Sequence, residues 1–277
     1  MTDSPMIDSP PDPVVVGIDG SEAAINAARW ATVEAIQRNV PLRLVCTVPT
    51  DGGLLGTDGS VLEYRRHASE ALRAASAAAT ETDQPVKIET EILYGNPSAV
   101  LVEESRTAAM VCVGSTGISA FSSRFLGSTA TDLAEQALCP VAIIRAPRRS
   151  PPSPTDFIVV AVDDSAADDK VVAFALSEAA LRHAPILAVG VWSEDFGDTP
   201  YDELDRRVQV WADQNPGQRI YPVTTRATVK RFLAENTDES VQLAIINSRD
   251  AHQVAAIIGP RRHPIVSHAF CSVLVVR

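Results

Sequence analysis

The sequence repeats itself, and this repeat constrains the fold more than any other feature. The run Val14–Ser21 (VVVGIDGS) is matched 144 residues later by Ile158–Ser165 (IVVAVDDS). A second pair of similar runs, Val141–Arg145 (VAIIR) and Val273–Arg277 (VLVVR), is offset by 132 residues. Both copies therefore start and end alike, and the second is 12 residues shorter. A chain of 277 residues with this internal symmetry predicts two copies of one structural unit.

Each copy alternates short β-rich runs with helix-forming segments. In the first copy, runs rich in valine, isoleucine and leucine predict strands at Val14–Ile18, Leu42–Val48, Val86–Leu93, Ala109–Val113 and Val141–Ile144. The segments between them predict helices, one of which begins with Asn96 as N-cap and Pro97 in the first turn. This alternation predicts an α/β fold. We expect two tandem, doubly wound, five-stranded parallel sheets, Rossmann-like or flavodoxin-like, each with strand order 3-2-1-4-5.

The domain boundaries follow from composition. Residues 1–13 are rich in proline, aspartate and serine and predict a disordered lead-in. We place the first unit at 14–146 and the second at 156–277, joined by a proline-rich linker at 147–155. The second unit is expected to lose most of its 12 residues in its second helix, predicted at about Tyr201–Asp213.

Composition excludes several classes of function. A formal net charge of −11 disfavours binding to nucleic acid or to anionic membranes. The N-terminus lacks the pattern of a signal peptide, and no apolar run approaches the roughly 20 residues of a membrane span, so we expect a cytoplasmic protein. The four cysteines form no CxxC pair and are expected to be reduced and mostly buried. His263 and His268 do not have metal-site spacing.

The segment after the fourth predicted strand carries the clearest chemical signal. It reads Gly114-Ser-Thr-Gly117, then nine residues, then Gly127-Ser128-Thr129 at the start of a helix. Glycines without a Cβ allow a sugar or phosphate to approach the backbone. Gly127 and the amides after it offer donors to an anion at a helix N-terminus, and the two hydroxyls could bind phosphate oxygens. The segment therefore predicts a phosphate-binding loop.

Two further residues are expected across the crevice from this loop. Asp19 ends the first strand, where its carboxylate can accept hydrogen bonds from a ribose hydroxyl or a base amine. Thr47 ends the second strand and could flank the base. Each residue also has an ordinary structural interpretation: a glycine after a strand is often only a turn, and Asp19, Ser21 or Ser128 could simply cap a helix.

The pattern Gly-x-x-Gly, nine residues, Gly-Ser, with a first strand that ends in aspartate, resembles the ATP-binding signature of the universal stress protein family. The resemblance covers nearly the whole chain and is similar to tandem members. It implies a regulatory, stress-response protein, rather than an enzyme, that binds ATP with Mg²⁺ bridging the phosphates. The nucleotide-binding residues that it implies are Asp19, Thr47, Val113, Gly114, Thr116, Gly117, Gly127, Ser128, Thr129 and Ala130.

The same resemblance implies how the two units assemble. Members of the family commonly pair through their last strands, so we expect an intrachain pseudo-dimer of the two halves, and a homodimer is a further possibility. A protein partner is also implied, but the sequence does not identify it. Nor does the sequence distinguish AMP, ADP, ATP or a cyclic nucleotide as the preferred ligand.

The second copy departs from the signature. Asn247-Ser-Arg249-Asp250 stands where the first copy has Gly114-Ser-Thr-Gly117, and Gly259-Pro260 replaces Gly127-Ser128. A carboxylate would repel phosphates, and proline removes both an amide donor and a hydroxyl. We therefore predict nucleotide binding in the first copy alone, although Asp163 matches Asp19.

Two alternative functions stay open at this point. One is a nucleotide-free protein-interaction module, and the other is a slow ATPase. The sequence has no P-loop, no Gly-x-Gly-x-x-Gly after the first strand and no Gly-x-Ser-x-Gly elbow. Asp132 is the one carboxylate close to the phosphate loop in sequence, and we interpret it as a first-turn helix charge.

Overall fold

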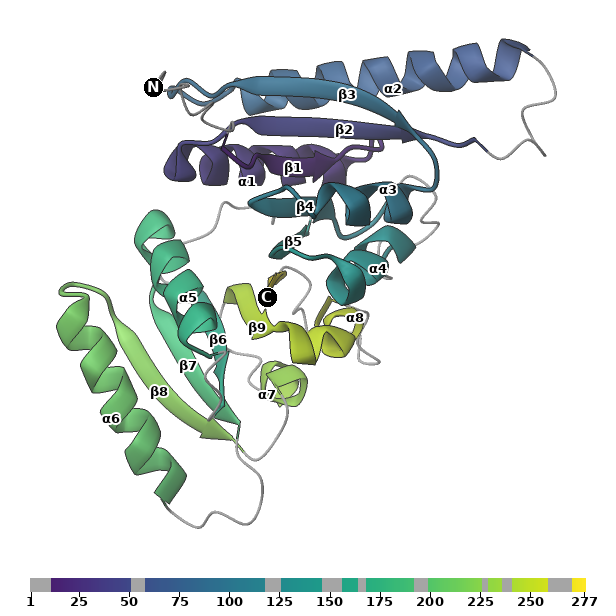
Figure 1. Cartoon of the computed structure of the whole chain (residues 1–277). Helices are drawn as coiled ribbons and strands as arrows, with labels where there is room; N and C mark the ends of the chain where they lie inside the picture. Colours follow the sequence, from purple (N-terminus) through teal and green to yellow (C-terminus); the bar gives the residue numbers. More distant parts are fainter. Residues whose placement is uncertain are drawn as a thin grey trace, which may run out of the picture.

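The computed structural model describes residues 11–50, 58–117, 126–145, 156–163, 168–191, 199–225, 229–235, 241–258 and 271–277 (Figure 1). The first half contains, in chain order, β1 (Val14–Gly17), α1 (Glu22–Arg38), β2 (Leu42–Val48), α2 (Asp58–Ala79), β3 (Ile88–Tyr94), α3 (Pro97–Glu104), β4 (Met110–Gly114), α4 (Ser128–Gln136) and β5 (Val141–Ile144).

The second half follows the same plan with a shorter second helix, as predicted. Its elements are β6 (Phe157–Val162), α5 (Asp168–Arg182), β7 (Ile186–Val191), α6 (Thr199–Gln214), β8 (Ile220–Thr225), α7 (Val229–Glu235), β9 (Val241–Asn247), the 3₁₀ helix η2 (Ser248–Gln253), α8 (Val254–Ile258) and β10 (Ser272–Val276). The helix α6 has 16 residues where α2 has 22, so it accounts for six of the 12 missing residues, which is half of them and not the majority that we predicted.

All ten described strands join in one sheet, in the order β3-β2-β1-β4-β5-β10-β9-β6-β7-β8. The strands are parallel within each half, and each half has the predicted order 3-2-1-4-5. The halves meet where β5 pairs antiparallel with β10, with Ile143 opposite Val273. The last strands therefore pair within the chain, as the resemblance implied.

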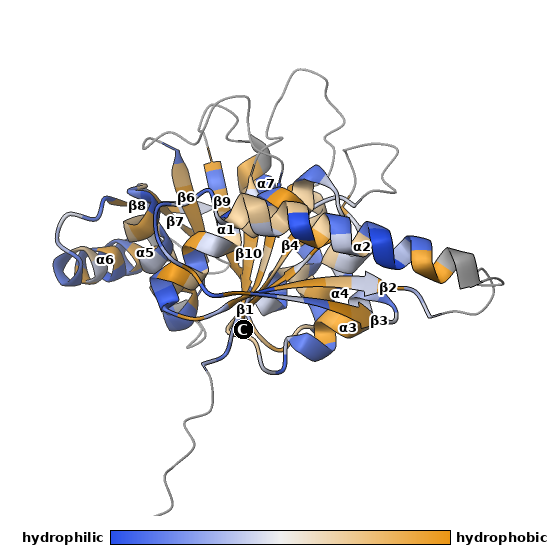
Figure 2. Cartoon of the chain, turned by 90° about the horizontal axis from the view of Figure 1, so that it is seen from above, coloured by the Kyte–Doolittle hydropathy of each residue, from blue (hydrophilic) through white to orange (hydrophobic). Residues whose placement is uncertain are grey.

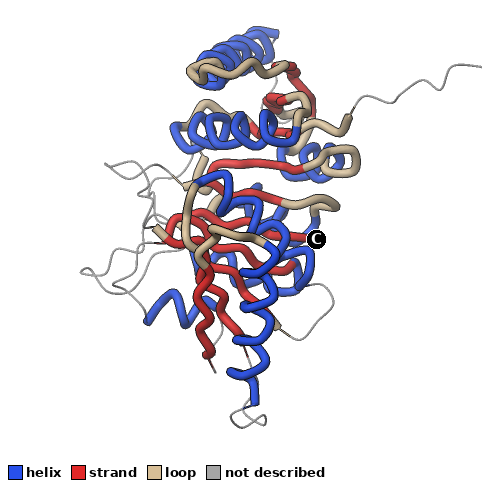
Figure 3. The backbone as a smooth tube through the Cα atoms, turned by 90° about the vertical axis from the view of Figure 1, so that its left-hand side faces the viewer, coloured by secondary structure: helices blue, strands red, loops and turns tan. Residues whose placement is uncertain are grey.

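The core lies on both faces of this sheet. Alternate residues of β1 face opposite sides. Val14 and Val16 belong to the core on the face that α1, α2, α5 and α6 cover, whereas Val15 belongs to the core on the face that α3, α4, α7 and α8 cover. Strands covered on both faces are expected to be apolar throughout, and Figure 2 shows hydrophobic strands beneath helices of mixed hydropathy. Figure 3 shows the strands between the two helical layers.

Local signals set most element boundaries. Ser21 caps α1 by accepting a hydrogen bond from the Ala24 amide, and α1 ends at Asn39 in the left-handed conformation, with φ of 53°. Asn96 caps α3 and Pro97 is its first residue, as predicted. The helix α2 begins at Asp58, three residues earlier than Val61, the start that the sequence predicted.

Most of the predicted lead-in and the linker at 147–155 lie outside the described residues. Within the lead-in, however, the Pro13 carbonyl accepts a hydrogen bond from the Ala109 amide at 2.9 Å, so the chain is already anchored one residue before β1.

All four cysteines are free and buried, as expected. No described helix combines the length and the apolar character that a bilayer crossing requires.

Candidate functional site

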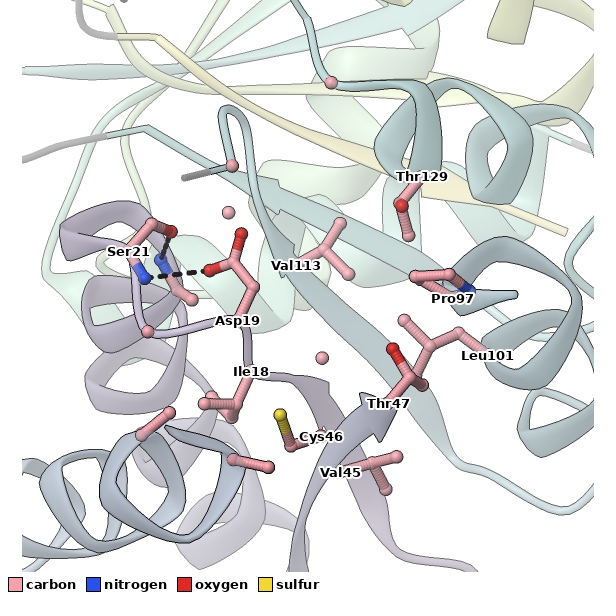
Figure 4. Close-up of a pocket in the computed structure, with 18 of the residues that line it drawn as sticks. Ile18, Asp19, Ser21, Val45, Cys46, Thr47, Pro97, Leu101, Val113 and Thr129 are labelled. Atoms are coloured by element: carbon pink, nitrogen blue, oxygen red, sulfur yellow. Dashed lines mark hydrogen bonds between the residues drawn. The ribbon is translucent and has the colours of Figure 1, made fainter. Parts of the chain in front are cut away.

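A cavity of about 1260 Å³ opens at the carboxyl ends of β1, β2 and β4 (Figure 4). The strand order reverses between β1 and β4, which pair with each other up to Gly17 and Val113. Doubly wound sheets hold their ligands at such a switch point. All ten residues that the sequence singled out line this cavity: Asp19, Thr47, Val113, Gly114, Thr116, Gly117, Gly127, Ser128, Thr129 and Ala130.

The turn between β1 and α1 forms one wall. Gly20 adopts φ of 88°, which favours glycine. Asp19 Oδ1 accepts a hydrogen bond from the Ser21 amide at 2.9 Å, so this carboxylate shapes the turn in addition to lining the cavity. Ser21 Oγ donates to the Thr116 carbonyl at 3.3 Å and thereby joins this turn to the loop after β4. The cap of α1 is Ser21 rather than Asp19.

The two glycines after β4 have different roles. A Cβ on Gly114 would lie 2.7 Å from the Ala23 carbonyl carbon and 2.8 Å from the Ala24 amide nitrogen. The backbone of α1 cannot move away, so Gly114 permits the packing of β4 against α1; we expected it to make room for a ligand. A Cβ on Gly117 would lie 2.8 Å from Asp19 Oδ2. Gly117 therefore leaves space that the Asp19 carboxylate borders.

The N-terminus of α4 forms the opposite wall. Gly127 is its N-cap and makes no side-chain cap, so Ser128, the first helical residue, does not cap the helix. The Gly127 amide donates to the Ser115 carbonyl at 2.9 Å, and the first intrahelical bond runs from Thr131 N to Gly127 O at 3.0 Å. The amides of residues 128–130 precede that bond and lie at the positive end of the helix dipole. The available donors therefore begin at Ser128, and the Gly127 amide is not one of them.

Asp132 does not fit the role that we gave it. It is the fifth residue of α4, and the first turn of this helix contains no acidic residue. Asp132 is also not among the residues that line the cavity.

The floor of the cavity is mainly apolar. Figure 4 shows Val45, Cys46 and Thr47 from β2 beside Val113 from β4 and Leu101 from α3. Val113 and Leu101 are almost fully buried. An apolar floor with one hydroxyl at its edge suits a flat heteroaromatic base.

Sequence reasoning missed the wall that α2 contributes. Tyr64, His67 and Glu70 line the cavity at helical spacing, together with Ala68, Ala71 and Ala74. Ala71 Cβ would lie 3.5 Å from a Cβ on Gly20, which places this part of α2 over the β1–α1 turn. The helical spacing was visible in the sequence, but nothing in it indicated which face of α2 would meet the crevice.

The Cys46 thiol also lines the cavity, and burial, followed by the nearby Asp19 charge, raises the pKa of Cys46 to about 11. At pH 7 the group is a neutral thiol and reacts slowly, because the thiolate is the nucleophile. We expect alkylation of Cys46 by iodoacetamide, followed by peptide mass spectrometry, to accelerate with each pH unit from 7 to 10 and to slow when a ligand fills the cavity. A rate that levels off near pH 8 would contradict the raised pKa.

In the second half, the residues that match Asp19 and the loop after β4 bond to neighbouring groups of the protein. Arg249 Nη2 lies 3.1 Å from Asp163 Oδ2, so the carboxylate that matches Asp19 is ion-paired. Asn247 accepts a hydrogen bond from the Arg249 amide and caps η2. Asp250 Oδ1 accepts one from Gln253 Nε2 at 2.6 Å. The predicted replacements at 259–263 and His268 lie outside the described residues.

The described residues contain no group of three or more His, Cys, Asp or Glu side chains that could hold a metal ion.

Comparison with known proteins agrees with this description. A sequence model of the universal stress protein family matches residues 11–145. Universal stress protein Rv2624c of Mycobacterium tuberculosis is 48% identical over 267 residues, which cover 95% of this chain and 96% of that protein. Universal stress protein Rv2028c of the same organism is 34% identical and covers 96% of each chain. The crystal structure of a universal stress protein from Archaeoglobus fulgidus DSM 4304 has a similar fold, with a TM-score of 0.71, 18% identity and 96% coverage of both chains.

Proposed function

This chain belongs to the universal stress protein family, and we propose that it is a regulatory protein that binds one adenine nucleotide, ATP, in the cavity of its first half. The observation that carries the proposal is the convergence, in one cavity, of an uncapped helix N-terminus, a glycine loop and a carboxylate. The proposed role is binding rather than catalysis, in a cytoplasmic protein.

The phosphate end of the ligand fits the α4 side of the cavity. The first residues of α4 line it, the helix has no side-chain cap there, and Ser128 and Thr129 add two hydroxyls. Amides at a helix N-terminus form a ready anion site because the donors and the helix dipole act together. Mg²⁺ would be held by the phosphates, since no described carboxylate cluster could hold it alone.

The nucleoside end fits the opposite side. Asp19 Oδ2 borders the space beside Gly117, where a carboxylate can accept hydrogen bonds from ribose hydroxyls or a base amine. The apolar floor of β2 and β4 would contact the base, with Thr47 at its edge. Net charge does not attract the ligand to a protein of formal charge −11, so affinity must come from these local donors.

The second half is proposed to bind no nucleotide, because Arg249 already pairs with Asp163. The alternative function is a nucleotide-free interaction module, and the second half would be an example of one. We also propose a homodimer and a protein partner, and neither proposal depends on the cavity.

Nucleotide content tests the proposal. Freshly purified protein is denatured, and any released nucleotide is identified by chromatography. The emptied protein is then titrated with ATP and Mg²⁺ by calorimetry. We expect about one ATP per chain, because the cavity of the first half is the one proposed site. Two per chain would show that the second half binds as well, and none would make the interaction module the leading function. Phosphate release during a long incubation separates simple binding from slow hydrolysis.

A further inference from the structure

We propose that Arg277, which belongs to the second half, is a positioning residue for the nucleotide site of the first half, because it holds the carboxyl end of α4. This inference rests on the proposed function. It assigns the second half a role in binding even though that half is proposed to hold no nucleotide.

The contact is made at the last turn of α4. Arg277 Nη2 donates to the Leu133 carbonyl at 3.1 Å and to the Ala134 carbonyl at 2.7 Å. In a longer helix the Leu138 amide would bond the Ala134 carbonyl, but here it donates to Ser105 Oγ at 2.9 Å. The guanidinium therefore takes the place of the missing helical bond.

The helix α4 is short, so the position of its carboxyl end affects the position of its N-terminal amides. α4 has nine residues, which corresponds to a length of roughly 14 Å. Its N-terminal residues line the cavity, whereas Leu133 and Ala134 are almost fully buried. A rotation or shift at the buried end moves the amides that face the ligand, because the hydrogen-bonded helix moves as one piece. A cation at the carboxyl end also complements the helix dipole.

The rest of the second half supports the same end. α4 packs against η2 and α8 of the second half, and β10, which precedes Arg277, pairs with β5. The guanidinium thus reaches α4 from a fixed strand. The position of α4 depends on contacts from both halves, and the pairing of β5 with β10 brings those contacts together.

The internal symmetry supplies a matched control. Arg145 occupies the position after β5 that Arg277 occupies after β10, and its guanidinium donates to the Ile258 carbonyl at the end of α8 in the second half. The two arginines therefore exchange equivalent contacts between the halves. Only the contact of Arg277 leads to the helix that lines the nucleotide cavity.

The test compares Arg277→Met with Arg145→Met in the full chain, using calorimetric titration with ATP·Mg²⁺ and with adenosine. We expect Arg277→Met to weaken ATP binding by about three- to tenfold, and adenosine binding by less than about twofold, because only the phosphates contact α4. Arg145→Met should leave both affinities near those of the unchanged protein. Arg277→Lys should recover part of the ATP affinity.

Several outcomes would overturn the inference. Equal losses for ATP and adenosine in Arg277→Met would indicate general damage, and equal losses in both arginine variants would indicate only a weaker contact between the halves. Hydrogen exchange of the α4 peptide in ligand-free protein provides a measurement that needs no nucleotide. Faster exchange should appear in Arg277→Met alone, and its absence would contradict the inference. If the unchanged protein binds no nucleotide but this exchange difference appears, the proposed function fails while the positioning contact stands.

Discussion

Replacing Gly117 with aspartate is expected to abolish nucleotide binding in the first half while the fold is retained. The substitution copies Asp250, the residue that stands at the equivalent position in the second half. A Cβ at position 117 would lie 2.8 Å from Asp19 Oδ2, so the new carboxylate would stand beside an existing one. Asp19 stands at the proposed nucleoside end, and the new carboxylate would extend from the loop that is proposed to bind the phosphates. Like charges at this range in a half-enclosed site should lower ATP affinity by at least about 100-fold.

The fold should survive because the atom that the new side chain meets is the end of an exposed, flexible side chain. Asp19 can rotate, in contrast to the α1 backbone that a substitution at Gly114 would meet. We expect the melting temperature to change by no more than about 4 °C. The matched control is Gln84→Asp, which adds the same charge on an exposed turn away from the cavity.

Calorimetric titration of both variants with ATP and Mg²⁺ measures the effect. The Gln84→Asp variant should bind like the unchanged protein, which would show that one additional negative charge on the chain is not sufficient. Unchanged affinity in Gly117→Asp would remove the loop after β4 from the site. A large fall in melting temperature would mean that Gly117 has a structural role instead.

Removing Arg182 is expected to cost the protein much of its stability. Arg182 on α5 lies 2.6 Å from Glu178 and, across the junction of the halves, 3.1 Å from Glu34 of α1. Both carboxylates are about 1% exposed. Arg38 of α1 lies 3.4 Å from Glu34, and Arg182 also lies over the Trp30 ring. The cluster is symmetric, because residues 30, 34 and 38 correspond to 174, 178 and 182.

Arg182→Met leaves the buried Glu34 carboxylate with one of its two guanidinium partners, Arg38, and removes the guanidinium that lies 2.6 Å from the buried Glu178. Arg182→Met should therefore lower the free energy of unfolding by about 3–5 kcal/mol. Urea denaturation at pH 7 measures this value. Arg206→Met is the control, because Arg206 pairs with Glu203 in an exposed, same-helix contact and should have little effect. A loss in Arg182→Met no larger than that of the control would contradict a structural role for the cluster.

The same cluster predicts a dependence of stability on pH. Burial raises the pKa of Glu178 from its ordinary value of 4.5 to about 8, while Arg182 acts in the opposite direction and Glu34 adds to the increase. Between pH 4.5 and about pH 8, Glu178 therefore keeps a proton in the folded protein that it has released in the unfolded chain. The stability contributed by this group is therefore present below about pH 4.5 and is lost as the pH rises towards 8.

The neutral variant Glu178→Gln tests the direction of this effect within the same measurements. Its free energy of unfolding should vary less between pH 5 and pH 8 than that of the unchanged protein, with the largest relative gain at pH 8. Glu203→Gln, at an exposed position, should leave the original pH dependence in place. Identical pH profiles for the unchanged protein and Glu178→Gln would show that Glu178 does not hold a proton.

Much of the fold followed from local patterns in the sequence. The strand from Leu42 to Val48 was predicted with its observed bounds because an apolar run of this length ends at polar or proline residues on both sides. The cap at Asn96 was predictable from its neighbour Pro97. The early start of α2 at Asp58 was not, because glycine and aspartate there favour a loop on propensity alone.

The candidate site was predictable to a different extent at each residue. The ten residues lie together because they follow strands whose carboxyl ends meet at one edge of the sheet. The sequence did not show what each glycine accommodates: Gly114 faces the α1 backbone, and Gly117 faces Asp19. Nor did it show that the Gly127 amide is already bonded to Ser115, which moves the available donors along the helix.

The sequence by itself determined the two-unit plan, the order of strands and helices, and the loops that carry the phosphate-binding pattern. These depend on apolar periodicity and on glycine and proline, which act over a few residues. Only the tertiary structure decided which distant side chains meet. Arg277 contacts α4 from 144 residues away, and Arg182 contacts Glu34 from 148 residues away. Such contacts exist because β5 pairs with β10, and packing across that junction, unlike periodicity, leaves no local trace in the chain.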